Sequence, residues 1–499
     1  MSWRLHSAGV ALGLAAAFAA PARADDAQSL RDEVQALQRR VRELEGSAPT
    51  QEEVEAAVSR YLVATPSTVL VGGGDGSAGF PLGKKPYIKE GPNKLEIGFR
   101  AQVRYSSFLY SDDAIGVVGD GANPENFALS DAAPRDRSGF ELERMYLVFE
   151  GSIFCEDITY KLELNFDTDS GSGIEKNYAY LDWKYLGEHH VRAGSDKVAY
   201  CYEENNSSSS LAFVDRSILT KAFEVGFQTG VSAWGYLGDC DCPKRFMYKL
   251  QAGNGEGRQN QEGGTSQGSP FNRDARDTYA DNLLFAGMFE WNLTCCAGDY
   301  KWDEVDHRAC DKRCELQAAV GVGGYYEDDE DTQRSAWGGL AVRGSGKAER
   351  YGLDAWFRAQ WNGFSFLAEY LLRNVKYADG SGQPEQQDHG VAATLHYRFA
   401  DTNWGLGVRG SMIWLDNDYL TVSAGRGAGS VDVEDTITEL GFVVNYFFYD
   451  HNNKISADVN WVQDNSGVNS SSAGYINGSA RGVIVEDGVM IRVQWQLNF

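Results

Sequence analysis

The segment Val489-Met-Ile-Arg-Val-Gln-Trp-Gln-Leu-Asn-Phe499 is the strongest indication of the fold. Every second residue in it is apolar, and from Arg492 onward the residues between them are polar. Successive side chains of a strand point to opposite faces, so this strand has one apolar and one polar face. Such a strand, ending on an aromatic residue, is typical of an outer-membrane barrel between lipid and water. A soluble sandwich is the alternative that the rest of the chain tests.

The composition narrows the class of protein. Lys and Arg number 46 against 71 Asp and Glu, a formal net charge of -25, which would repel nucleic acid, so we expect no nucleic-acid partner. Aromatic residues make up 12% of the chain and Pro only 11 residues, which suits many strands. Beyond the N-terminus no apolar run approaches the roughly 18 residues of a membrane helix, so membrane contact must come through strands.

The N-terminal region is predicted to lie outside the barrel. Residues 1–24 have the charge, apolar core and Ala-Arg-Ala cleavage pattern of a secretory signal peptide. Residues 25–65 are predicted to form a periplasmic helical segment, and residues 66–92 a Gly-rich flexible linker. The helical segment carries an apolar heptad seam, typical of a coiled coil, at Leu30, Val34, Leu37, Val41 and Leu44. A lone amphipathic helix is the alternative to a coiled coil.

Residues 93–499 repeat the alternating pattern many times. Leu353 to Trp361 and Val391 to Phe399, for example, alternate apolar residues with polar ones that are often charged. Charged residues do not suit the packed interior of a sandwich and indicate a wet lumen. Short and long connections alternate along the chain, as in outer-membrane barrels. We therefore predict an all-β fold, an antiparallel transmembrane barrel of about sixteen strands around an aqueous channel.

Several segments resemble the phosphate-selective porin O/P family. They are Arg144-Met-Tyr-Leu-Val-Phe-Glu-Gly151, Asp157-Ile-Thr-Tyr-Lys-Leu-Glu-Leu-Asn-Phe166, Ala179-Tyr-Leu-Asp-Trp183, Val191-Arg-Ala-Gly-Ser-Asp-Lys-Val198, Leu211-Ala-Phe-Val-Asp-Arg-Ser217 and Glu439-Leu-Gly-Phe-Val-Val-Asn-Tyr-Phe447. The resemblance implies a sixteen-stranded homotrimeric porin in the lipid of the outer membrane. It also implies that the third outer loop, here residues 199–221, folds into the lumen as a constriction.

Basic residues near that loop are the candidate pore lining. They are Arg100, Arg104, Arg144, Lys161, Arg192, Lys197, Arg216 and Lys221. Inward acids are about as numerous as inward bases, and Tyr146 stands where the family often has a second Arg. Phosphate selectivity is therefore not inferred, and we expect only a weak preference for anions.

The cysteines predict disulfides, because an exported chain meets an oxidising compartment. The candidates are Cys240, Cys242, Cys295, Cys296, Cys310 and Cys314. At least one bridge is expected to close within residues 295–314. A metal site of these cysteines with His307 is the alternative, but their spacing matches no zinc pattern. We predict no metal and no cofactor.

The functional prediction is a general porin for passive diffusion of small hydrophilic solutes. A G-x-S-x-G match at residues 264–268 lies in a polar loop without the strand-to-helix turn that a nucleophile needs, so no catalytic site is predicted. The alternative is a structural tether, in which the N-terminal coiled coil grips the cell wall and the barrel serves as an anchor.

Overall fold

The computed structural model describes sixteen ranges of the chain, separated by gaps. The ranges are 76–79, 85–110, 115–120, 123–130, 137–166, 175–240, 242–254, 283–295, 302–307, 316–329, 336–337, 340–341, 348–377, 385–416, 436–464 and 483–499. The predicted signal peptide, heptad seam and first part of the linker lie outside these residues.

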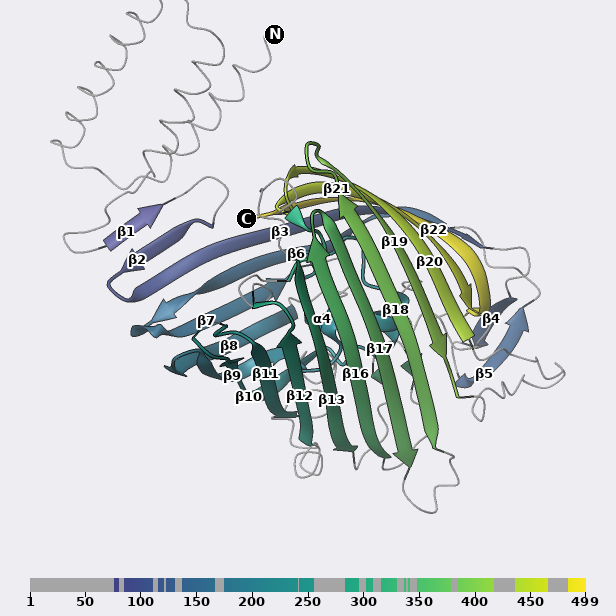
Figure 1. Cartoon of the computed structure of the whole chain (residues 1–499). Coiled ribbons are helices and arrows are strands. Elements are labelled where there is room, and N and C mark those ends of the chain that lie inside the picture. The colour runs from purple at the N-terminus through teal and green to yellow at the C-terminus, as the bar shows by residue number, and fades with distance from the viewer. Residues whose placement is uncertain are drawn as a thin grey trace, which may run out of the picture. The chain divides into compact units, whose positions relative to one another are not determined.

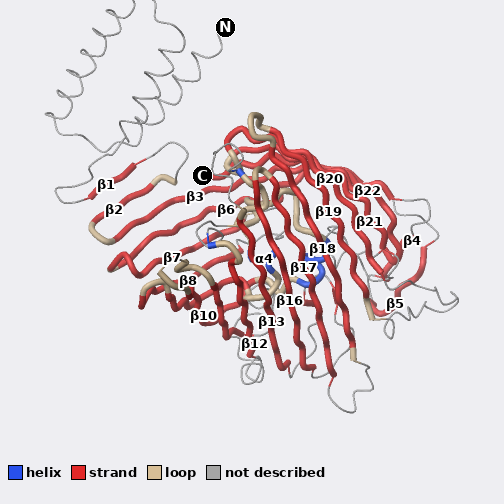
Figure 2. Tube along the Cα trace, in the orientation of Figure 1, coloured by secondary structure: helices blue, strands red, loops and turns tan. Residues whose placement is uncertain are grey.

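Sixteen antiparallel strands of the described residues form one closed barrel (Figures 1 and 2). They are β3 (Asn93–Tyr110), β6 (Arg137–Ile153), β7 (Cys155–Asn165), β8 (Glu175–Leu186), β9 (His189–Lys197), β10 (Phe227–Leu237), β11 (Phe246–Asn254), β12 (Leu283–Asn292), β13 (Gln317–Asp329), β16 (Ala348–Trp361), β17 (Phe364–Tyr377), β18 (Gln386–Arg398), β19 (Trp404–Trp414), β20 (Thr436–Tyr449), β21 (Asn453–Asp464) and β22 (Val483–Asn498). Each pairs with the next in this order, and β22 pairs with β3 from Gly488↔Tyr110 to Asn498↔Arg100. The predicted barrel and its strand number are confirmed.

The alternation of side chains explains why these segments form a barrel. Along β18 and β19, buried and more exposed residues alternate strictly. The more exposed set is largely apolar, as at Leu395 and Val408, whereas the buried set includes His396 and Arg409. The apolar face therefore points outward and the polar face into the lumen. No helix among the described residues has the length and apolar character needed to cross a bilayer.

Shorter strands accompany the barrel. In the predicted linker, β1 (Gly76–Gly79) pairs with β2 (Tyr87–Glu90), which extends the sheet beside β3. Two strands, β4 (Ile115–Asp120) and β5 (Asn123–Ser130), form a hairpin, and β4 also pairs with the start of β22. Another small pair is β14 (Ala336–Trp337) with β15 (Leu340–Ala341).

One end of the barrel carries tight turns and is called the short-turn end below. The turn between β16 and β17 consists of Asn362 and Gly363, with φ of 49° and 88°. Positive φ at both central residues gives a turn whose twist matches that of the strands. At the opposite end, every residue of the connection between β9 and β10 is described, and this connection folds into the barrel.

Candidate functional site

The connection between β9 and β10, residues 198–226, lies inside the barrel and is called the lumenal loop below. Most of its residues are buried, among them Leu211, Phe213 and Leu219. These side chains would be exposed in an outer loop, whereas inside the barrel they leave water. The loop contains the short helices α4 (Tyr202–Asn205) and α5 (Ile218–Phe223). The predicted constriction, residues 199–221, falls within it.

Two carboxylates on the opposite wall hold the starts of these helices. Glu369 of β17 accepts a hydrogen bond from the backbone N–H of Tyr202 at 2.5 Å. Glu439 of β20 accepts one from the backbone N–H of Ile218 at 3.1 Å. The first amides of a helix have no partner within the helix, and a carboxylate satisfies them. Because β20 lies about half-way round the barrel from β9, the loop crosses the lumen.

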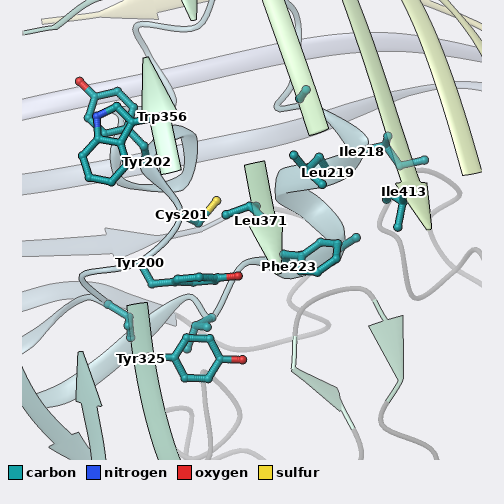
Figure 3. Packing of buried hydrophobic residues seen from close by; sticks show 14 of the residues in the cluster. Tyr200, Cys201, Tyr202, Ile218, Leu219, Phe223, Tyr325, Trp356, Leu371 and Ile413 are labelled. Carbon is teal, nitrogen blue, oxygen red and sulfur yellow. The ribbon is translucent and has the colours of Figure 1, made fainter. Parts of the chain in front are cut away.

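Apolar packing also holds the lumenal loop against the wall strands (Figure 3). The ring of Tyr202 stacks on Trp356 with centroids 4.8 Å apart, and Tyr200 meets Tyr325 edge-on, also at 4.8 Å. The same buried cluster includes residues of α5 and of the wall strands, namely Ile218, Leu219, Phe223, Leu371 and Ile413. Burial of these large side chains makes release of the loop costly.

Asp215 ties the middle of the loop to the near strands. Its carboxylate lies 3.4 Å from Arg104 of β3, 3.2 Å from Arg144 of β6 and 3.6 Å from Lys221 of the loop. Burial alone would raise the pKa of Asp215, but these three cations hold it well below its ordinary value. On the other side, Arg409 donates to the backbone carbonyl of Asp215 at 2.8 Å. Asp215 is thus held ionised between two walls.

Two further cations act within the loop rather than facing water. The ammonium group of Lys197 donates to the backbone carbonyls of Glu204 and Asn206. Arg216 donates to the same two carbonyls, at 3.2 and 3.0 Å. These contacts close the turn after α4. The predicted pore-lining residues Lys197 and Arg216 therefore pin the loop's own backbone.

The inner face from β12 to β22 consists largely of buried side chains. Five of its inward arginines pair with a buried carboxylate of the wall, whereas Arg398 lies beside Asp450 of the turn after β20. The pairs are Arg350–Glu327, Arg358–Glu290, Arg373–Asp388, Arg409–Glu439 and Arg492–Asp458. Charges neutralised in this way are shielded from a passing ion.

The inner face from β7 to β11 is different, because three of its cations, unlike the buried Lys197, reach solvent. The side chains of Lys161, Arg192 and Lys249, called the basic strip below, are 21%, 17% and 13% exposed. Their partners are buried more deeply: Glu163 is 4%, Asp182 3% and Asp196 6% exposed. The strip thus presents positive charge to the water and keeps its carboxylates behind.

Aromatic rings support the basic strip. The ammonium of Lys161 lies 3.9 Å from the ring centre of Tyr178, and the guanidinium of Arg192 lies 4.0 Å from that of Tyr180. A cation over a ring face is stabilised without losing its hydrogen-bond donors. The rings therefore hold both cations in place while leaving them accessible.

The remaining predicted residues divide between these roles. Arg100 donates to the hydroxyl of Ser208 at 2.8 Å and is partly exposed, as is Lys221 beside Asp215. Arg104 and Arg144 are buried under the loop. Lys249 was not predicted, although Met247, Lys249 and Gln251 alternate with outward residues along β11. That alternation is the signal that could have found it.

The disulfide connects two neighbouring turns at the short-turn end. Cys242 pairs with Cys295, with Cα atoms 5.2 Å apart. Cys295 therefore takes no part in the bridge predicted within residues 295–314, because β11 and β12 bring it beside the turn before β11, and that prediction stays untested. The other candidates in that segment, Cys296, Cys310 and Cys314, lie outside the described residues. Among described cysteines, Cys155, Cys201 and Cys240 are in no disulfide.

Comparison with known proteins gives the family. A family model for the phosphate-selective porins O and P matches residues 123–465. The chain belongs to this porin family. Membership makes it an outer-membrane channel protein. No curated protein sequence matches the chain.

Solved porins have a similar fold. OprB of Pseudomonas putida aligns with a TM-score of 0.50 and 11% identity, over 81% of this chain and 94% of that one. An anion-selective porin from Comamonas acidovorans aligns with a TM-score of 0.49 and 10% identity, over 82% of this chain and 100% of that one. OmpF of Salmonella typhi, in complex with daunomycin, aligns with a TM-score of 0.45 and 12% identity over 82% and 100%. The likeness to OprB supports the barrel fold alone.

Proposed function

We propose that this porin lets small hydrophilic solutes diffuse past the lumenal loop along the basic strip, with a weak preference for anions. The observation that carries the proposal is the difference in exposure between cations and their partners, such as Arg192 at 17% and Asp182 at 3%. In a narrow channel, low-dielectric walls focus the potential of a few fixed charges. The preference is weak because each cation has a carboxylate beside it.

Dedicated phosphate binding is not part of the proposal. Arg192 already donates to Asp182 at 2.7 Å and to Asp196 at 2.8 Å, and Lys249 lies 3.0 Å from Asp196. A phosphate group would have to compete with these carboxylates for the same donors. A site built for phosphate would instead leave its donors unpaired. We therefore expect phosphate to pass as other small anions do.

The reversal potential in a salt gradient tests this proposal. Lys161→Ala plus Arg192→Ala removes two cations of the basic strip and leaves the contacts that hold the lumenal loop unchanged. We expect wild type to be weakly anion-selective and the double variant to shift toward cations. The control Lys89→Ala removes a cation from an exposed pair on β2, outside the sixteen barrel strands, and should not shift. A strongly cation-selective wild type, or an unshifted double variant, would refute the proposal.

We also propose that the porin works as a homotrimer in outer-membrane lipid, with its N-terminal segment in the periplasm. The support is the outward apolar face of the barrel together with the trimer implied by the sequence resemblance. Cross-linking of the intact protein in detergent should give trimers. Monomers alone would contradict this assembly.

The structural tether is kept as a second candidate because of the heptad seam from Leu30 to Leu44. Deletion of residues 25–65 separates the two functions. A porin lacking this segment continues to conduct, whereas a tether loses its hold on the cell wall. Envelope detachment with full conductance would show that both functions reside in one chain.

A further inference from the structure

A second segment enters the barrel, at the short-turn end. It belongs to the connection between β12 and β13, and it consists of the described residues 302–307, which are called the inner segment below. The backbone N–H of Glu304 donates to the carbonyl of Ser210 at 3.2 Å, and its carboxylate accepts from the N–H of Ala212 at 2.8 Å. Asp306 accepts from the N–H of Gly363 at 3.1 Å. The inner segment thus joins the lumenal loop to the barrel rim.

Three side chains that could bind a metal meet where this segment touches the turn between β20 and β21. They are Asp303 and His307 of the inner segment and His451 of the turn, and one ligand atom from each lies within 4.8 Å of the others. Asp303 lies 2.6 Å from Nε2 of His451, and the two imidazole rings are perpendicular with centroids 4.7 Å apart. Imidazole and carboxylate are ligands that zinc favours.

Unused hydrogen-bonding capacity is a second, independent indication. Nε2 of His307 and Nδ1 of His451 are both buried without a hydrogen-bond partner. A buried ring nitrogen without a partner costs free energy, which a metal bond would remove. Nδ1 of His307 lies 2.5 Å from Nη1 of Arg398 and 3.2 Å from the carboxylate of Asp450. A guanidinium only donates, so Nδ1 accepts from Arg398 and the proton of the neutral ring lies on Nε2. Metal binding at Nε2 therefore requires this proton to move to Nδ1, where the carboxylate of Asp450 can accept it.

The local charge also favours a cation. Four carboxyl groups lie in the inner segment and the adjoining turn: Asp303, Glu304, Asp306 and Asp450. Two permanent cations oppose them, Arg398, which lies 3.3 Å from Asp450, and Lys454, which donates to the carbonyl of Leu211. The surplus of negative charge can accommodate a divalent ion. Two imidazoles in the set favour zinc over magnesium or calcium, which prefer oxygen ligands only.

We propose that Asp303, His307 and His451 bind one divalent transition-metal ion, zinc by its ligand chemistry, which clamps the inner segment to the turn between β20 and β21. Because Glu304 of the same segment holds the lumenal loop at Ala212, the ion would also steady that loop from below. The site does not depend on the proposed ion preference of the channel. It differs from the alternative metal site of cysteines with His307, because His307 is the one residue that both sites share.

Calorimetric titration of the intact, detergent-purified protein with ZnCl2 tests the site. Metal is first removed with EDTA, and free thiols are blocked with iodoacetamide so that cysteines do not bind zinc. Wild type should bind one zinc ion per chain, and MgCl2 should not bind there. His307→Gln and His451→Gln should each weaken zinc binding by at least about tenfold. The matched control His189→Gln, at the same end of the barrel, should bind as wild type does.

CoCl2 gives a spectroscopic readout that distinguishes a site from a structural role. Wild type should show the visible absorption of low-coordinate cobalt, and the two histidine variants should lose it. Retention of a heat-dependent gel shift shows that each variant remains folded, and Asp303→Asn replaces any variant that does not fold. Absent zinc binding in folded wild type, or equal binding by folded variants, would overturn the proposal and leave a plain His451–Asp303 hydrogen bond.

Discussion

At the scale of single residues, the lumenal loop depends on carboxylates that serve two partners at once. Glu439 accepts from the backbone of Ile218 and also pairs with Arg409 at 2.7 Å. Its partner Arg409 donates to the carbonyl of Asp215 in turn. One buried carboxylate therefore couples the barrel wall to two points of the loop.

Glu439→Gln should loosen the loop without opening the barrel. The change leaves Arg409 buried without its counter-charge. Removing one partner of a buried ion pair lowers the free energy of unfolding by about 3–5 kcal/mol. We expect larger and noisier single-channel currents, because the helix start at Ile218 loses its anchor. Glu327→Gln, which breaks the buried pair with Arg350, is the matched control. Unchanged currents in Glu439→Gln, or equal noise in the control, would contradict this coupling.

At the scale of elements, the sequence predicts strands far better than it predicts the roles of their charges. The strand from Val391 to Phe399 follows from alternation alone, since a period of two is a local property. Whether an inward base faces water, as Arg192 does, or pins the loop, as Lys197 does, depends on the path of a segment that crosses the lumen. For the same reason the meeting of Asp303 with His451 has no local signal in the sequence.

The lumenal loop should also respond to pH through Glu224, which follows α5. Burial, together with the nearby charge of Glu204, raises the pKa of Glu224 to about 8, although Lys221 and Arg216 oppose the shift. Lys197 of β9 faces the same group. The folded loop therefore favours the protonated acid. The raised pKa of Glu224 contributes to the free energy of unfolding. This contribution is complete below the unfolded pKa of about 4.3 and is lost as pH rises through about 8.

Single-channel recording across this pH range checks the expectation. Current fluctuations should increase as pH rises from neutral through about 8 in wild type, and Glu224→Gln should remove that dependence. Glu188→Gln is the control, since Glu188 lies exposed in a turn at the barrel rim. A wild type whose currents are independent of pH here would show that Glu224 does not hold the loop.

At the scale of the whole molecule, closure makes the barrel robust. The pairing of β22 with β3 leaves the barrel without a free edge, so backbone groups remain satisfied in lipid. We expect a β-rich circular dichroism spectrum and a shift in gel mobility only after heating. A helical spectrum, or mobility independent of heating, would contradict a closed barrel.

Solutes are expected to pass along the wall from β7 to β11 and not along the packed wall from β12 to β22. Thiol modification during single-channel recording distinguishes the two paths. Lys161→Cys lies on the first wall and Ser411→Cys on the second, and unsubstituted protein gives the baseline for the native cysteines. A bulky thiol reagent should lower the conductance of Lys161→Cys and leave Ser411→Cys at the baseline. Block of Ser411→Cys with no effect on Lys161→Cys would show that solutes do not follow the basic strip.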